Sequence, residues 1–214
     1  MIKKSSVSKL HWNYFLALEQ DLARASRFIE FCEPNLPVFS IELAHLLFAA
    51  ASEVDVLAKC ICEIVAPKQR RRDINDYKEI IMGAVSKTKK MGEPYFPNIA
   101  TIEIRVPRYG LAFNPWENWA KDTNPDWWRS YNNVKHERNK FFHQATLQNA
   151  LNALGALLIL NFYYYRLPSR DWNPKATTRR LTPEPTLLRL PENYYDSIWA
   201  TIGEAHSASF DFSS

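Results

Sequence analysis

Two long apolar stretches, each interrupted by polar side chains, place the strongest limit on what this chain can fold into. They cover residues 41–65 and 147–167. The interruptions are Glu42, His45, Glu53, Asp55 and Lys59 in the first stretch, and Asn149, Asn152 and Asn161 in the second. A helix that spans a bilayer needs about 20 consecutive apolar residues with few or no charges. Both stretches therefore predict helices of a protein core, and no membrane association is expected.

Two further helices are expected around this core. Residues 9–32 repeat apolar side chains near helical spacing and carry charges on the other side, and Pro34 then breaks the pattern. Ser40 is a side chain that caps helices, so the first apolar helix is expected to begin at Ser40 or a neighbouring residue and to end near Val65. A short helix is expected over residues 73–85. This order of segments indicates a helical bundle.

The second half of the chain adds an extended piece, a long helix and a tail. Residues 101–112 alternate apolar and polar side chains, as a short strand or extended arm does. A last long helix is expected over residues 124–166, with a proline in its first turn. The predicted fold is therefore an all-α bundle over residues 1–166 with a small extended insertion. An irregular, proline-rich tail, residues 167–214, is expected to pack on the bundle or on a partner protein.

Composition narrows the class of protein. With 214 residues, of which 46% are hydrophobic, the chain is long enough for one sizeable core. Five glycines are few for a β-sandwich or for a phosphate-binding loop, so no nucleotide cofactor is expected. The net charge of +4 permits contact with RNA without requiring it. Cys32, Cys60 and Cys62 are odd in number and lack metal or redox spacing, which predicts reduced thiols in a cytoplasmic protein.

Residues 131–143 carry a dense run of polar and basic side chains. On a regular helix, which turns by about 100° per residue, four side chains of this run and one just before it would form one polar stripe. The members of this stripe are Arg129, Asn132, His136, Asn139 and His143. Arg138 would point away from the stripe and toward the core, where Glu53 or Asp55 could pair with it. Arg138 is thus either part of a chemical site or one half of a structural, buried ion pair.

A metal site is the third possibility for this run. His136 and His143 lie two helical turns apart on one face, with Asn139 between them. No acidic side chain joins the stripe, and the spacing is longer than metal-binding histidines usually have. The sequence therefore predicts no metal at this place.

The motif Arg138-Asn139-Lys140-Phe141-Phe142-His143 resembles the Arg–polar–three residues–His signature of HEPN domains. In that family the motif lies early in the last long helix of a small helical bundle. The preceding Tyr-Asn-x-Val-Lys-His pattern is similar to that of HEPN-like bacterial proteins of unassigned function, and the Ser52-Glu53-x-Asp55 stretch suits the fold. The resemblance covers roughly residues 9–166.

The resemblance implies a metal-independent endoribonuclease that acts as a homodimer, in defence or stress response. Arg138 would neutralise the scissile phosphate, because a guanidinium offers a permanent charge and a planar fork. His143 would be the general base or acid, and Asn139 would orient the phosphate or the imidazole. The side chains expected to contact RNA are Arg129, Asn132, Lys135, His136 and Lys140. The expected product is a 2′,3′-cyclic phosphate.

The rival interpretation is a non-catalytic HEPN-like module. Such a module would dimerise or bind a protein partner through the polar stripe, and the proline-rich tail could contribute to that contact. Arg138 would then be structural, paired with Glu53 or Asp55.

Overall fold

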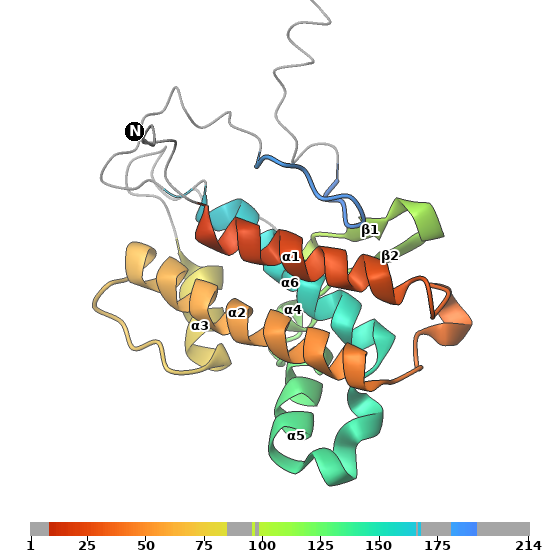
Figure 1. The fold of residues 1–214 in the computed structure, drawn as a ribbon. Helices are drawn as coiled ribbons and strands as arrows, with labels where there is room; N and C mark the ends of the chain where they lie inside the picture. The colour runs from red at the N-terminus through yellow and green to blue at the C-terminus, as the bar shows by residue number, and fades with distance from the viewer. Residues whose placement is uncertain (1–8, 85–95, 97–98, 166, 168–180, 192–214) are drawn as a thin grey trace, which may run out of the picture.

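The computed structural model describes residues 9–84, 96, 99–165, 167 and 181–191, and the fold is mostly α-helical with one small two-stranded sheet. Helices α2 (Ile41–Val65) and α6 (Leu147–Tyr164) pack against each other at the centre (Figure 1). Ser40 caps α2 by accepting a hydrogen bond from the Leu43 amide at 3.1 Å, so the predicted start is confirmed. Among the described residues, no helix is long and apolar enough to cross a membrane.

Helix α1 (Leu10–Ala25) packs on α2 and α6, and it ends earlier than the prediction of residue 32. The Ser26 hydroxyl donates to the Ala23 carbonyl at 2.7 Å, and the chain then turns toward the 3-10 helix η1 (Glu33–Asn35). Phe28 is 86% exposed, so the apolar spacing that suggested a longer helix does not bury this side chain. Tertiary packing, not periodicity, sets this boundary.

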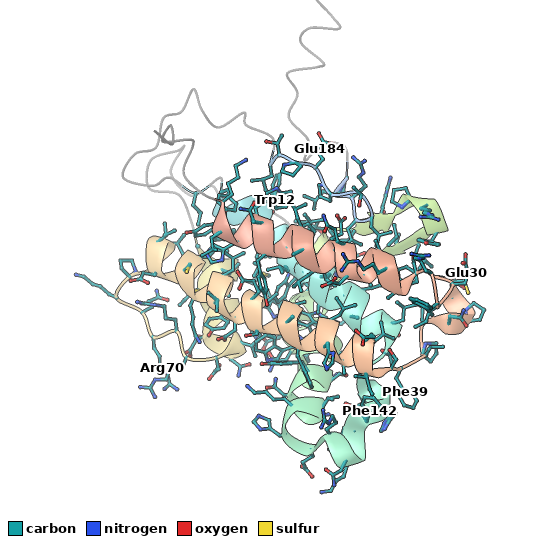
Figure 2. All side chains as sticks on the ribbon, viewed as in Figure 1. Trp12, Glu30, Phe39, Arg70, Phe142 and Glu184 are labelled. Carbon is teal, nitrogen blue, oxygen red and sulfur yellow. The ribbon has the colours of Figure 1, made fainter. Side chains whose placement is uncertain are left out.

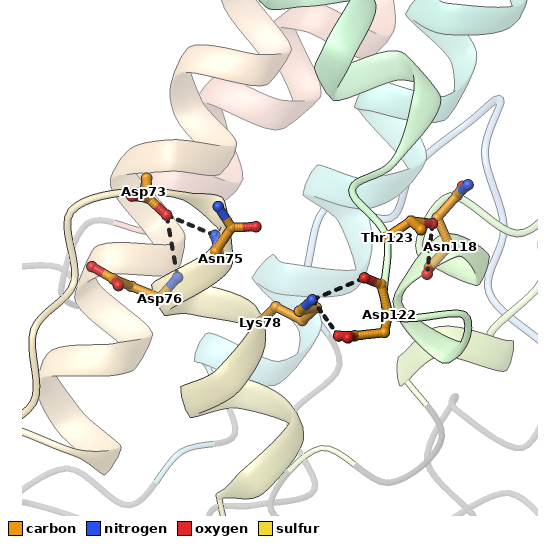
Figure 3. Close-up of polar contacts among 7 residues, drawn as sticks. All are labelled: Asp73, Asn75, Asp76, Lys78, Asn118, Asp122 and Thr123. Carbon is orange, nitrogen blue, oxygen red and sulfur yellow. Dashed lines mark hydrogen bonds and ion pairs between the residues drawn. The ribbon is translucent and has the colours of Figure 1, made fainter.

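Helix α3 (Ile74–Gly83) agrees with the short helix predicted over residues 73–85. The Asp73 carboxylate caps it by accepting hydrogen bonds from the Asn75 and Asp76 amides (Figure 3). Lys78 then reaches the loop that follows α4 (Glu117–Ala120), where its ammonium lies 2.5 Å from the Asp122 carboxylate. This ion pair connects two segments that are distant in the sequence.

The predicted extended segment is a β-hairpin. Strand β1 (Ile104–Val106) pairs in antiparallel fashion with β2 (Leu111–Phe113), after the 3-10 helix η2 (Ile99–Thr101). Between the strands, η3 (Pro107–Tyr109) ends at Gly110, whose φ of 66° suits glycine. The hairpin packs on α6, where a glycine on the helix lets Phe113 and Ile104 approach closely.

The four tryptophans that follow the hairpin are buried. They are Trp116, Trp119, Trp127 and Trp128. Trp116 packs on both Trp119 and Trp127, and the Trp127 indole donates to the Pro115 carbonyl at 2.7 Å. Their rings therefore stabilise the segment that leads into α5.

Residues 181–191 of the predicted tail pack on the bundle along α1. The Glu19 carboxylate is only 1% exposed and accepts hydrogen bonds from the main-chain amides of residues 186–188. The backbone of Arg189 exchanges two hydrogen bonds with that of Arg105, of 2.9 and 2.8 Å, which extends the hairpin. The rest of the predicted tail, residues 168–180 and 192–214, lies outside the described residues.

The prediction of one continuous helix over residues 124–166 was wrong. Helix α5 (Asp126–Phe141) contains a non-helical residue, Glu137, with φ −137° and ψ 54°. The 3-10 helix η4 (Phe142–Gln144) follows, and α6 begins only after Thr146, whose hydroxyl caps it by accepting from the Asn149 amide at 3.2 Å. Helix α5 therefore projects from one end of the bundle (Figure 1).

Candidate active site at the turn between α5 and α6

The break at Glu137 changes which way the motif side chains face. A regular helix would point Arg138 toward the core, whereas the structure leaves it exposed together with Asn139, Lys140 and His143. The backbone dihedrals of Glu137 interrupt the helical progression just before the motif. All four polar side chains thus reach solvent at the end of α5.

The two phenylalanines inside the motif account for this arrangement. Phe141 and Phe142 pack against a small apolar cluster of Ala44, Val134 and Ala145. The Phe142 ring also meets the Phe39 ring edge-on at 5.5 Å between centroids, and the two lie beside each other in Figure 2. The apolar half of the motif thus anchors the turn.

Hydrogen bonds hold the turn from two further directions. Leu147 and Gln148 donate their amides to the carbonyls of Val38 and Leu36, at 2.9 and 3.0 Å, which ties the start of α6 to the segment before α2. Gln144, next to His143, accepts hydrogen bonds from the side chains of Asn133 on α5 and Asn149 on α6. Sequence reasoning missed this role of Gln144. The Thr146-Leu147 step, a capping residue before an apolar run, could have indicated a new helix start.

The side chains predicted to contact RNA differ in their surroundings. Arg129 pairs with Asp126, and Lys140 pairs with Glu137, so part of their charge is neutralised locally. Lys135 lies over the Tyr131 ring, 5.3 Å from its centroid.

Among the remaining predicted side chains, one forms a hydrogen bond within α5 and the others are available to a ligand. The Asn132 amide group is used within α5, where it donates to the Trp128 carbonyl at 2.9 Å. His136 is exposed on α5, before the break. Within the described part of the chain, Arg138, Asn139 and His143 form no side-chain hydrogen bond or ion pair. These motif side chains are therefore open to an external ligand.

The predicted buried ion pair of Arg138 is not formed. Glu53 faces α1, where one of its oxygens lies 2.5 Å from His11 Nδ1. Asp55 faces the other way, pairs with Lys59 and accepts a hydrogen bond from the Tyr77 hydroxyl at 2.7 Å. Both carboxylates have their partners within the bundle, and α5 extends away from them.

A metal site and a reactive Cys62 thiol each place a requirement on the described residues. Those residues contain no group of three or more His, Cys, Asp or Glu side chains that could hold a metal. Burial raises the pKa of the Cys62 thiol to about 12, which disfavours the reactive thiolate. The exposed Arg138 and His143 are the side chains of the turn best suited to phosphate binding and proton transfer.

Comparisons with protein-family models, with curated proteins and with solved structures give no match. The chemical properties of the turn are therefore inferred from the side chains that it presents. A fixed backbone presents a guanidinium, an amide and an imidazole to solvent, from Arg138, Asn139 and His143 respectively.

Proposed function

We propose that this chain is a HEPN-like, metal-independent endoribonuclease that acts as a homodimer in the cytoplasm. The observation that carries the proposal is the exposure of Arg138 and His143 at one turn, without partners among the described residues. A cation left without a carboxylate partner is suited to a phosphate. The imidazole of His143, five residues further along the chain, can move a proton in either direction.

The proposed reaction uses the ribose 2′-hydroxyl as nucleophile. His143 accepts the hydroxyl proton while the 2′-oxygen bonds to phosphorus and the bond from phosphorus to the 5′-oxygen breaks. The second protomer's imidazole gives a proton to the leaving 5′-oxygen, and Arg138 neutralises the charge on the phosphate. Asn139 orients the phosphate, and Lys135 and Lys140 contact the RNA backbone. The products are a 2′,3′-cyclic phosphate and a 5′-hydroxyl.

Exposed apolar side chains beside the turn support the dimer. Val38, Phe39 and Ile41 are 37%, 48% and 63% exposed. Phe39 pairs with Thr146 through a β-bridge and contacts Phe142, so this apolar surface adjoins the motif. A second copy that covers it would bring two motifs together.

The test is cleavage of labelled, mixed-sequence RNA by the full chain in the presence of EDTA. Arg138→Ala and His143→Ala are compared with matched controls, Arg27→Ala and His45→Ala, because both control side chains are also exposed. We expect each motif variant to lose at least about 100-fold in rate and each control to retain it. Equal rates in motif and control variants, or cleavage that requires a divalent metal, would contradict the proposal.

The apolar surface of Val38, Phe39 and Ile41 also favours a second candidate, a non-catalytic HEPN-like module that dimerises or binds a protein. Sedimentation of wild type and of Phe39→Glu separates the two candidates. A dimer that Phe39→Glu dissociates, together with an absence of RNA cleavage at high protein concentration, would favour the module.

A further inference from the structure

Gln144, the residue after His143, is held at both its side chain and its main chain. Its Oε1 accepts a hydrogen bond from Asn133 Nδ2 at 3.0 Å, and its carbonyl accepts one from Asn149 Nδ2 at 2.8 Å. We propose that Asn133, Gln144 and Asn149, together called the amide clasp, are positioning residues that fix the His143 imidazole for catalysis. The inference rests on the proposed ribonuclease function.

The clasp adds polar bonds to a turn that apolar packing also anchors. Phe142 and Ala145, on either side of the His143–Gln144 pair, are anchored in the small apolar cluster. His143 is exposed, and its own side chain makes no bond within the described residues. Without the clasp, residues 143 and 144 would be fixed only through their neighbours. The clasp adds one bond to the Gln144 carbonyl and one to the Gln144 side chain, directly beside the imidazole.

The three side chains come from three different elements: α5, η4 and α6. All three are partly buried, which shields their hydrogen bonds from water. The α6 cap does not depend on the Asn149 side chain, because Thr146 Oγ1 accepts from the Asn149 main-chain amide. Replacement of the Asn149 side chain therefore removes the clasp bond and leaves the helix cap in place.

The chemistry of the Asn133–Gln144 contact provides a sharp genetic test. Gln144→Glu keeps an acceptor for the Asn133 amide. Asn133→Asp is tolerated if the Gln144 amide rotates and donates instead. The double variant places two carboxylates against each other, so neither can donate. Each isosteric single variant should therefore function, and the two changes should fail when combined.

The experiment measures the single-turnover cleavage rate, its pH profile and the RNA dissociation constant for the full-length protein. We expect Asn133→Ala, Gln144→Ala and the Asp–Glu double variant to lose about 10- to 100-fold in rate, as misplaced catalytic groups do. The dissociation constant should change less than about 3-fold, since Arg138 and the lysines are untouched. The pH profile should shift, because the surroundings of the imidazole change. Asn133→Asp and Gln144→Glu should stay near wild type.

The control variant is Asn152→Ala, which removes an asparagine whose side chain donates to the Gln148 carbonyl within α6. It should cleave RNA as the wild type does. A rate loss in the clasp variants that matches their loss of RNA binding or of folded protein overturns the inference. The inference is also overturned if the fold-loss in rate of the double variant equals the product of the fold-losses of the two single variants.

A readout without RNA keeps the clasp separable from the ribonuclease proposal. The His143 imidazole signals, assigned in NMR spectra by comparison with His143→Ala, should move or broaden in Asn133→Ala and stay unchanged in Asn152→Ala. If the wild type does not cleave RNA but these signals respond, the ribonuclease proposal fails and the clasp positions the imidazole. Signals that are the same in wild type and Asn133→Ala overturn the clasp.

Discussion

The Tyr77 phenol is held in its protonated form by its surroundings. The side chain is fully buried and donates to the Asp55 carboxylate, and burial together with this hydrogen bond raises the pKa of Tyr77 above its ordinary value of 10.0. In the unfolded chain the phenol ionises near the ordinary pKa. The folded state therefore binds one more proton above about pH 10. The stability that Tyr77 contributes is fully present below pH 10 and is lost as the pH rises toward the raised pKa.

Because the stability from Tyr77 is lost as the pH rises above 10, the Tyr77→Phe variant should respond to pH differently from the wild type. The variant loses a buried hydrogen bond to a carboxylate, so we expect the free energy of unfolding at pH 8 to fall by about 1–3 kcal/mol. Its stability should then decline less steeply than that of the wild type between pH 9 and about pH 11. Urea unfolding at several pH values measures both effects. Tyr14→Phe, at an exposed tyrosine, should match the wild type throughout. Parallel pH curves for Tyr77→Phe and wild type would contradict the prediction.

The break between α5 and α6 could not be predicted from the apolar spacing of the sequence, because that spacing continues across the break. Apolar side chains continue at helical spacing through Val134, Phe141 and Ala145, and all three do pack together. They pack against Ala44 near the start of α2, although the chain turns between Phe141 and Ala145, so the pattern reports their burial and not the path of the backbone. Only Thr146, a capping side chain inside the supposed helix, carries local information about the second start.

The contact between α6 and the hairpin depends on glycine at position 155, which has no side chain. A Cβ atom there would lie 2.7 Å from Phe113 Cε2 and 3.2 Å from Ile104 Cγ1, both on the hairpin. We expect Gly155→Ala to cost about 1–3 kcal/mol through overpacking, offset by about 1 kcal/mol of helix propensity. Thermal unfolding measures the net loss. Gly83→Ala is the control, because nothing lies within 4 Å of its Cβ position. Equal melting temperatures for the two variants would rule out a tight contact.

Across the whole molecule, the sequence predicted features that depend on local signals. The predicted starts of α2 near Ser40 and of α3 near residue 73 agree with the structure because the capping side chain of each helix bonds to amides within its own first turn. The partners of Glu53 could not be predicted, since His11 lies 42 residues away and periodicity carries no pairing information. The same holds for the contact between Asn133 and Gln144, which exists only because α5 is broken.

Glu19 on α1 accepts hydrogen bonds from residues 186–188, so it joins the first and last parts of the described chain. A change at Glu19 should therefore loosen the last part. Glu19→Gln replaces an acceptor oxygen with a donor group that faces main-chain amides, so at least one bond should be lost, at about 1.5–3 kcal/mol. Amide hydrogen exchange of residues 183–190 should accelerate, while that of α2 changes less. The exposed Glu30→Gln is the control. Unchanged exchange over residues 183–190 would show that apolar contacts alone hold this segment.

The Glu19 contact also determines when α1 can pack fully during synthesis of the chain. Thr186, whose amide binds this carboxylate, lies 167 residues further along the chain. During synthesis, α1 is therefore complete long before its buried charge can be satisfied. Burial of an unpartnered carboxylate costs several kcal/mol, so α1 cannot settle fully on α2 and α6 in a nascent chain that lacks residues 186–188. Synthesis must therefore reach residue 188 before α1 is locked in place.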